Sequence, residues 1–285
     1  MAAGFDKNGA VFNQFSDFGF SHIEVGTVTP KGQPGNEKPR SFRIPEDKGL
    51  INRMGFNNRG VDALVKKLEH KRRKGLIIGG NIGKNTNTPN SEAVLDYEAC
   101  FRALYGNVDY FVVNVSCPNI SDMRKLADQE GLELIINRLT DIRKQMDHYI
   151  PVLLKISPDL NNKQIDTSLD IVIKYGIDGI VATNTTVSRT NLSTSMKTIE
   201  AIGNGGMSGA PLTARSLEIV RYVTAKTKGK LPIIGVGGIM SVQDALNMLD
   251  AGATLIQVYS GFIYNGPGFI RQINRAILTS RKKQL

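Results

Sequence analysis

Short runs of apolar, mostly β-branched residues recur along this chain. There are seven of them, at 22–28, 76–82, 109–115, 151–157, 178–184, 232–238 and 254–260. Most are continuously apolar, as are parallel strands that helices cover. The segments 131–146 and 241–252 between them have helical spacing. With "MAAGFDKNG" as the remainder of a truncated first strand, this order predicts an α/β fold, a (β/α)8 TIM barrel in one domain spanning 1–285.

Polar residues stand where each apolar run stops. In a barrel these positions converge on the face where barrel enzymes keep their chemistry. They are Thr27, Asn81, Asn114, Lys155, Thr183, Asn184, Gly237, Gly238, Tyr259 and Ser260. Two long connections, 29–75 and 184–231, are rich in Gly, Asn, Ser and Thr, so we expect functional loops over this face.

Glycine-rich segments follow the last two runs. They read "GVGGI" at 235–239 and "VYSG" at 258–261, and "GMSG" at 206–209 lies in the connection before them. Glycines let backbone N–H groups approach an anion, and barrel enzymes often bind phosphate after strands seven and eight. The sequence therefore predicts a phosphate-bearing cofactor.

Two lysines lie at strand ends. Lys155 interrupts the apolar run "VLLKIS", and a lysine that points into a barrel must meet an anion or shift its pKa. A solvent-seeking lysine is the alternative. Lys7, in "GFDKNG", is a second cation near the predicted mouth, or else a surface lysine near the terminus.

Composition narrows the functional classes. The 285 residues include two cysteines and three scattered histidines, so neither a disulfide framework nor a metal site is expected. No apolar run approaches the ~18 residues of a membrane span. The net charge of +10 is compatible with nucleic acid, an anionic membrane or anionic small ligands. The densest basic run, 66–74, is predicted as the solvated end of a helix, with membrane or RNA contact as the alternative.

Several longer motifs together resemble the dihydroorotate dehydrogenase family, the flavin enzymes of pyrimidine synthesis. They are "AAGFDKNG", "IEVGTVTPKGQPGNEKPR", "INRMGFNN", "NIGKN", "NVSCPN", "ATNTT", "GMSG", "IIGVGGI" and "VYSGF". The second and third resemble the membrane-associated, quinone-using class 2. The resemblance implies FMN as cofactor, dihydroorotate and orotate as substrate and product, quinone as electron acceptor, and no nucleic-acid partner.

The resemblance also implies residue roles. The FMN contacts fall on Ala3, Gly4, Lys7, Thr27, Asn81, Asn114, Lys155, Thr183, Gly209, Gly238, Tyr259 and Ser260. The substrate contacts fall on Lys7, Asn52, Arg53, Met54, Gly55, Phe56, Asn114, Asn119, Asn184 and Thr185. Asparagine amides offer both a donor and an acceptor, which suits the edges of a planar polar ring.

Cys117 stands where the family places the base that takes a proton from the substrate. Class 2 enzymes typically have serine at this position and class 1 enzymes cysteine, so the chain resembles class 2 in its body and class 1 at its base. A thiol has a free pKa of about 8.5, well below that of a serine hydroxyl, so it needs less activation. Together with Lys155, Cys117 is expected to be catalytic. Cys100, in a helical segment, is expected to be a small buried residue.

Class 2 proteins also carry N-terminal helices that form a quinone tunnel and rest on the membrane, and this segment is expected to be absent here. For the full-length protein the resemblance implies a peripheral location on the cytoplasmic side of the cell membrane. The alternatives are a soluble class 1 enzyme using fumarate or NAD, a tRNA-dihydrouridine synthase-like FMN barrel, and an inactive truncated barrel.

Overall fold

The computed structural model describes residues 1–115 and 129–282. A curled parallel sheet forms its centre, and its strands follow the order β1-β6-β7-β8-β9-β11-β12. They are β1 (His22–Val28), β6 (Ile77–Ile82), β7 (Tyr110–Asn114), β8 (Val152–Ile156), β9 (Gly179–Ala182), β11 (Ile233–Val236) and β12 (Leu255–Gln257). Each of the seven predicted strands is present, so the α/β barrel prediction is confirmed.

Residues 1–4 occupy the space between the first and last of these strands. The Glu24 N–H donates to the Met1 carbonyl at 2.9 Å, and the Ala2 N–H donates to the Val258 carbonyl at 3.1 Å. The Gly4 N–H donates to the Gly26 carbonyl at 2.7 Å. The opening residues thus bridge β1 and the segment after β12.

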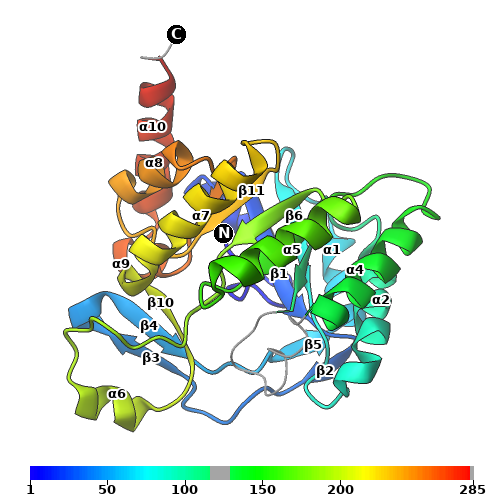
Figure 1. Cartoon of the computed structure of the whole chain (residues 1–285), viewed down its shortest axis with the longest axis horizontal. Coiled ribbons are helices and arrows are strands. Elements are labelled where there is room, and N and C mark those ends of the chain that lie inside the picture. Colours follow the sequence, from blue (N-terminus) through cyan, green and yellow to red (C-terminus); the bar gives the residue numbers. More distant parts are fainter. Residues whose placement is uncertain (116–128, 283–285) are drawn as a thin grey trace.

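Helices surround the sheet (Figure 1). They are α1 (Val61–Leu68), α2 (Ala93–Leu104), α4 (Gln129–Arg143), α5 (Asn162–Lys174), α6 (Met196–Ile202), α7 (Thr213–Thr227), α8 (Val242–Asp250), α9 (Ser260–Asn265) and α10 (Gly268–Lys282). A capping box begins α8, since Ser241 Oγ accepts from the Asp244 N–H and the Asp244 carboxylate accepts from the Ser241 N–H. Four 3₁₀ helices lie in the connections of the described residues. The longest is Phe12–Phe18, and the others are single turns at Pro45–Asp47, Asn90–Glu92 and Ala210–Leu212.

The two long connections contain more regular structure than the sequence indicated. The first carries β2 (Lys31–Gln33), β3 (Ser41–Ile44), β4 (Gly49–Asn52) and β5 (Asn58–Gly60), and the second carries β10 (Gly206–Gly209). Antiparallel pairing joins β10 to β4 and β4 to β3, so both connections contribute to one small sheet. Figure 1 shows this sheet beside α6, set off from the main sheet. It fixes the two predicted loops to each other.

The two faces of the main sheet have different roles. Residues such as Phe111, Val113 and Leu154 face the helices and belong to the large core. Their neighbours Val112 and Leu153 belong to a small cluster inside the barrel. Because side chains alternate along a strand, the residues two positions further on point inward as well. This alternation places Asn114 and Lys155 inside the barrel, at its carboxyl end.

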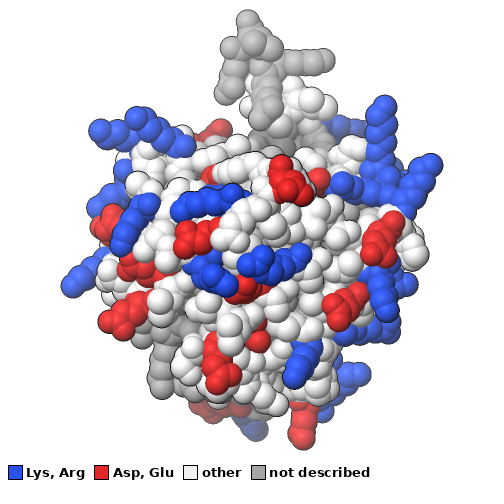
Figure 2. Space-filling model, turned by 90° about the vertical axis from the view of Figure 1, so that its right-hand side faces the viewer, with Lys and Arg blue, Asp and Glu red and all other residues white. Residues whose placement is uncertain are grey.

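The basic run at 66–74 is mostly not helical, because α1 ends at Leu68. Arg72 and Arg73 form ion pairs with Asp109 and Asp17. Figure 2 shows Lys and Arg interspersed with Asp and Glu across the middle of one face of the molecule. No helix in the described part of the chain has the length and apolarity needed to cross a membrane.

Candidate active site

A pocket opens at the carboxyl ends of the strands, between the barrel and the small sheet. Its volume is about 970 Å³ including the open mouth, at the upper end of the range for small-molecule sites. Residues at the carboxyl ends of β1, β7, β8, β9, β11 and β12 line it, together with the opening residues and both long connections. A pocket at this end of a parallel barrel is where the fold positions chemistry.

Most of the residues expected at the site lie together in this pocket. They are Ala3, Gly4, Lys7, Thr27, Asn52, Met54, Gly55, Phe56, Asn114, Lys155, Thr183, Asn184, Thr185, Gly209, Gly238, Tyr259 and Ser260. Segments more than 200 residues apart in sequence thus converge on one cavity.

Two expected residues, Asn81 and Arg53, do not line the pocket, and two more lie outside the described residues. Asn81 is fully buried beneath the lining, where it contacts Thr27. Arg53 does not line the pocket, and its guanidinium donates to the carbonyls of Ile202 and Asn204 and lies over the Phe42 ring. Cys117 and Asn119 lie outside the described residues.

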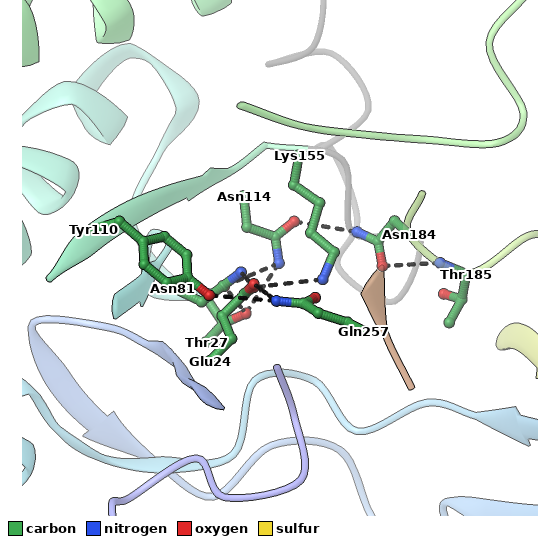
Figure 3. A network of polar contacts seen from close by, with 9 residues as sticks. All are labelled: Glu24, Thr27, Asn81, Tyr110, Asn114, Lys155, Asn184, Thr185 and Gln257. Carbon is green, nitrogen blue, oxygen red and sulfur yellow. Dashed lines mark hydrogen bonds and ion pairs between the residues drawn. The ribbon is translucent and has the colours of Figure 1, made fainter. Parts of the chain in front are cut away.

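A buried carboxylate forms the base of the polar site. Glu24 is fully buried and points into the barrel from β1 (Figure 3). Its Oε1 accepts from Asn81 Nδ2 at 2.6 Å, and its Oε2 accepts from Gln257 Nε2 at 2.7 Å. Lys155 Nζ lies 3.6 Å from Oε1. The inward-pointing lysine therefore meets an anion, as the sequence required.

From Glu24 a row of side chains leads to the mouth of the pocket. Thr27 Oγ1 donates to Asn81 Oδ1, and Asn114 Nδ2 donates to Thr27 Oγ1 at 2.9 Å. Asn184 Nδ2 donates to Asn114 Oδ1 at 3.2 Å, while Asn184 Oδ1 accepts from the Thr185 N–H. Each amide has partners on both sides, so the row holds fixed donors and acceptors beside the cavity (Figure 3).

The second cation of the pocket comes from the opening residues of the chain. Lys7 Nζ donates to Asn57 Oδ1 at 2.6 Å. Lys7 and Lys155 both line the cavity, so it presents two cations to anionic groups bound there.

The glycine-rich segments form a further wall. Gly209, Gly237 and Gly238 all have positive φ angles and line the pocket. The Ser208 and Ser260 hydroxyls lie 2.8 Å apart beside them. Ser260 also begins α9, and the first N–H groups of a helix lack intrahelical partners. Phosphate groups in proteins are commonly bound by accessible backbone N–H groups, by hydroxyls and by the N-termini of helices.

Sequence reasoning missed Glu24, Gln257 and Tyr110. Gln257 Nε2 also lies 3.4 Å from Tyr110 Oη, and burial followed by the nearby Glu24 charge raises the pKa of Tyr110 well above its usual value. The signal was present: Glu24 interrupts the apolar run "HIEVGTV", just as Lys155 interrupts "VLLKIS". Two opposite charges in separate buried strands of one barrel predict a pair.

Comparison with known proteins supplies the family. The model of the dihydroorotate dehydrogenase family matches residues 1–280. A dihydroorotate dehydrogenase (quinone) of Christiangramia forsetii is 51% identical over 98% of this chain and 80% of its own length. That of Idiomarina loihiensis is 46% identical over 96% of this chain and 81% of its own length. The crystal structure of the Eimeria tenella enzyme with ferulenol has a TM-score of 0.91 at 34% identity, covering the whole of this chain and 81% of that one. This chain therefore belongs to the dihydroorotate dehydrogenase family.

Proposed function

We propose that this protein oxidises dihydroorotate to orotate with FMN as cofactor and passes the electrons to a quinone. The observation that carries the proposal is that three features meet in one pocket. They are the glycine-rich segments suited to phosphate, the buried Lys155 with its partner Glu24, and the row of asparagine amides. The family is flavin-dependent, and we propose FMN as the flavin of this chain.

The residues present suit FMN. Gly209, Gly238 and Ser260 would hold its phosphate, and Lys155 would lie at its ring. Gln257 Oε1 is buried, faces no hydrogen-bond partner among the described residues, and belongs to a side chain that lines the pocket. Such an acceptor suits the N–H edge of a flavin ring. When bound, FMN supplies the acceptor for a hydride, and the chemistry is that of the cofactor.

Gly238→Ala is expected to raise the FMN dissociation constant at least about tenfold and to lower the free energy of unfolding by about 1–3 kcal/mol. At φ +74° the new Cβ would overlap the Thr213 backbone, which lies behind the phosphate wall. Titration of the apoprotein with FMN and chemical unfolding measure both effects. Gly229→Ala is the matched control, because Gly229 has φ +68° and open space around it. Equal losses of FMN affinity in the two variants would refute the assignment.

The substrate is expected to lie against the amide row. Asn52, Asn114 and Asn184 present amide groups to the cavity, and Lys7 offers a cation for a carboxylate. Orotate is planar, with amide edges and one carboxylate, so its polar groups match this set. Asn119, outside the described residues, is proposed to complete it, and Arg53 is proposed to act by holding the adjoining loop in place.

The reaction removes a proton from C5 and a hydride from C6 of dihydroorotate, and the C5=C6 double bond forms. We assign the proton to the thiolate of Cys117, which lies outside the described residues. Lys155 would stabilise the negative charge that the bound flavin gains with the hydride.

Quinone is the acceptor that the relatives' names favour, over the fumarate or NAD of a class 1 enzyme and over a tRNA-modifying barrel. Because quinones reside in membranes, we propose that the protein lies at the cytoplasmic side of the cell membrane as a peripheral protein. We propose that a single barrel domain contains both the FMN and the substrate sites.

The test is anaerobic addition of dihydroorotate to the purified, FMN-loaded protein. We expect the flavin absorption band to bleach and a soluble quinone to restore it. A loaded protein whose band does not respond to dihydroorotate would contradict the proposed function. A protein that takes up no FMN would support the inactive barrel instead.

A further inference from the structure

Glu24 has no direct access to the pocket, yet it contacts three groups that shape it. It is fully buried, while Lys155 and Gln257 line the cavity and Asn81 connects to Thr27 and Asn114, which do so too. A carboxylate buried in this way is costly unless donors compensate it. Two amide N–H groups and one ammonium do so here.

An ionised carboxylate accepts hydrogen bonds and donates none. Glu24 therefore forces the amide of Asn81 to turn its NH₂ group inward and its oxygen toward Thr27 and Asn114. It likewise turns the NH₂ group of Gln257 inward, which leaves Gln257 Oε1 as an unused acceptor. A neutral side chain at position 24 would not impose this direction on both neighbours.

The same carboxylate offsets the charge of Lys155. The two side chains are 0% and 7% exposed, so solvent screens their interaction little. Lys155 can therefore act on a ligand only with its charge partly balanced by Glu24.

We propose that Glu24 is a positioning residue that sets the electrostatic potential of the flavin site through Lys155. This inference rests on the proposed function, because it needs a flavin ring beside Lys155. Glu24 holds the ammonium in place and limits how strongly the site favours the anionic, reduced ring. The consequence is a reduction potential lower than Lys155 alone would give.

The test is the reduction potential of bound FMN in Glu24→Gln, measured by photoreduction against indicator dyes, without dihydroorotate. Loss of the buried negative charge is expected to raise the reduction potential of bound FMN. The expected rise is about 30 mV, which for a two-electron couple corresponds to an about tenfold higher ratio of the dissociation constant of oxidised FMN to that of reduced FMN. A folded, loaded Glu24→Gln protein with an unchanged potential would mean that Glu24 only stabilises the fold, and would overturn the proposal.

The double variant Glu24→Gln/Gln257→Glu is the matched control. It moves the carboxylate across the existing hydrogen bond and keeps the buried charge, while Gln at position 24 can accept from Asn81 and donate to Glu at position 257. Because position 257 lines the pocket, the potential is expected to return to the wild-type value or below it. A potential above wild type in this variant would refute the proposal, even if Glu24→Gln alone does not hold FMN.

The outcomes separate this inference from the proposed function. If the potentials shift as expected but dihydroorotate does not bleach the wild-type flavin, only the proposed substrate is wrong. If dihydroorotate bleaches the flavin and the potentials do not shift, only the role of Glu24 is wrong. A wild-type protein that binds no FMN would contradict both.

Discussion

Lys155→Met is expected to slow the reduction of bound FMN by dihydroorotate by a factor of about 10²–10³. Lys155 is a cation that the barrel itself places in the pocket, on the inward face of β8 and two residues after Leu153. Its loss would remove the positive charge that we propose acts on the reduced flavin, and it leaves the buried Glu24 carboxylate without the ammonium of Lys155. Breaking such a pair costs about 3–5 kcal/mol of stability. Anaerobic stopped-flow measurement of flavin bleaching gives the rate, and thermal unfolding gives the stability.

Lys84→Met is the control that separates the effect on the rate of flavin reduction from the effect on stability. Lys84 is as buried as Lys155, but its ammonium donates to the carbonyls of Asn85 and Thr88, and it does not line the pocket. We expect this variant to lose stability while its flavin-reduction rate per bound FMN stays near wild type. If both lysine variants slowed flavin reduction equally, the role of Lys155 would be structural rather than electrostatic.

The central sheet could be predicted because its signal is local. Each inward-facing polar residue interrupts or ends an apolar run, and the parallel arrangement brings those ends together without further information. Asn114 and Lys155 were placed correctly on this basis, since they close neighbouring strands and are partners in the register. The same logic applied to Glu24 would have found the carboxylate before the structure did.

The small antiparallel sheet could not be predicted in the same way. Its strands are only four residues long, and β10 pairs with β4 across more than 150 residues of sequence. Short strands with glycines carry a weak period-two signal, and such distant pairing has no local signature. Arg53 illustrates the consequence. Its side chain binds backbone carbonyls of the other connection, which only the assembled fold brings near.

Two parts of the fold therefore position the residues at the barrel mouth: the strands of the barrel and the small antiparallel sheet. The barrel strands fix the Glu24–Lys155 pair and the asparagines of the strands, because side chains alternate along a strand and these positions face the inside of the barrel. The small sheet fixes Asn52 and Gly209 by pairing one long connection with the other. A change in the first should alter the reactivity of the flavin, whereas a change in the second should alter ligand affinity.

Cys117→Ala is expected to slow flavin reduction by dihydroorotate by a factor of about 10²–10⁴, the usual contribution of a general base. Cys117→Ser should be less severe, but its rate should continue to rise at pH values where the wild-type rate has levelled off. The sign follows from the free pKa of a thiol, about 8.5, since protonation removes the base as the pH falls through that pKa. A serine hydroxyl ionises far above this range. Both pH profiles, of the wild type and of Cys117→Ser, are measured by single-turnover flavin bleaching. A range of about pH 6 to about pH 10 brackets the thiol pKa.

Cys100→Ala provides the control for these profiles, because both variants lose one thiol. Cys100 is fully buried in α2, and burial raises the pKa of its thiol well above the usual value. Its Sγ lies 3.8 Å from the Val28 carbonyl, away from the pocket lining. Alanine there should cost some stability through lost packing and leave the pH profile in place. A profile that moves with Cys100 but not with Cys117 would show that the assigned base is wrong, because only a group that ionises at the substrate can set the pH at which proton removal begins.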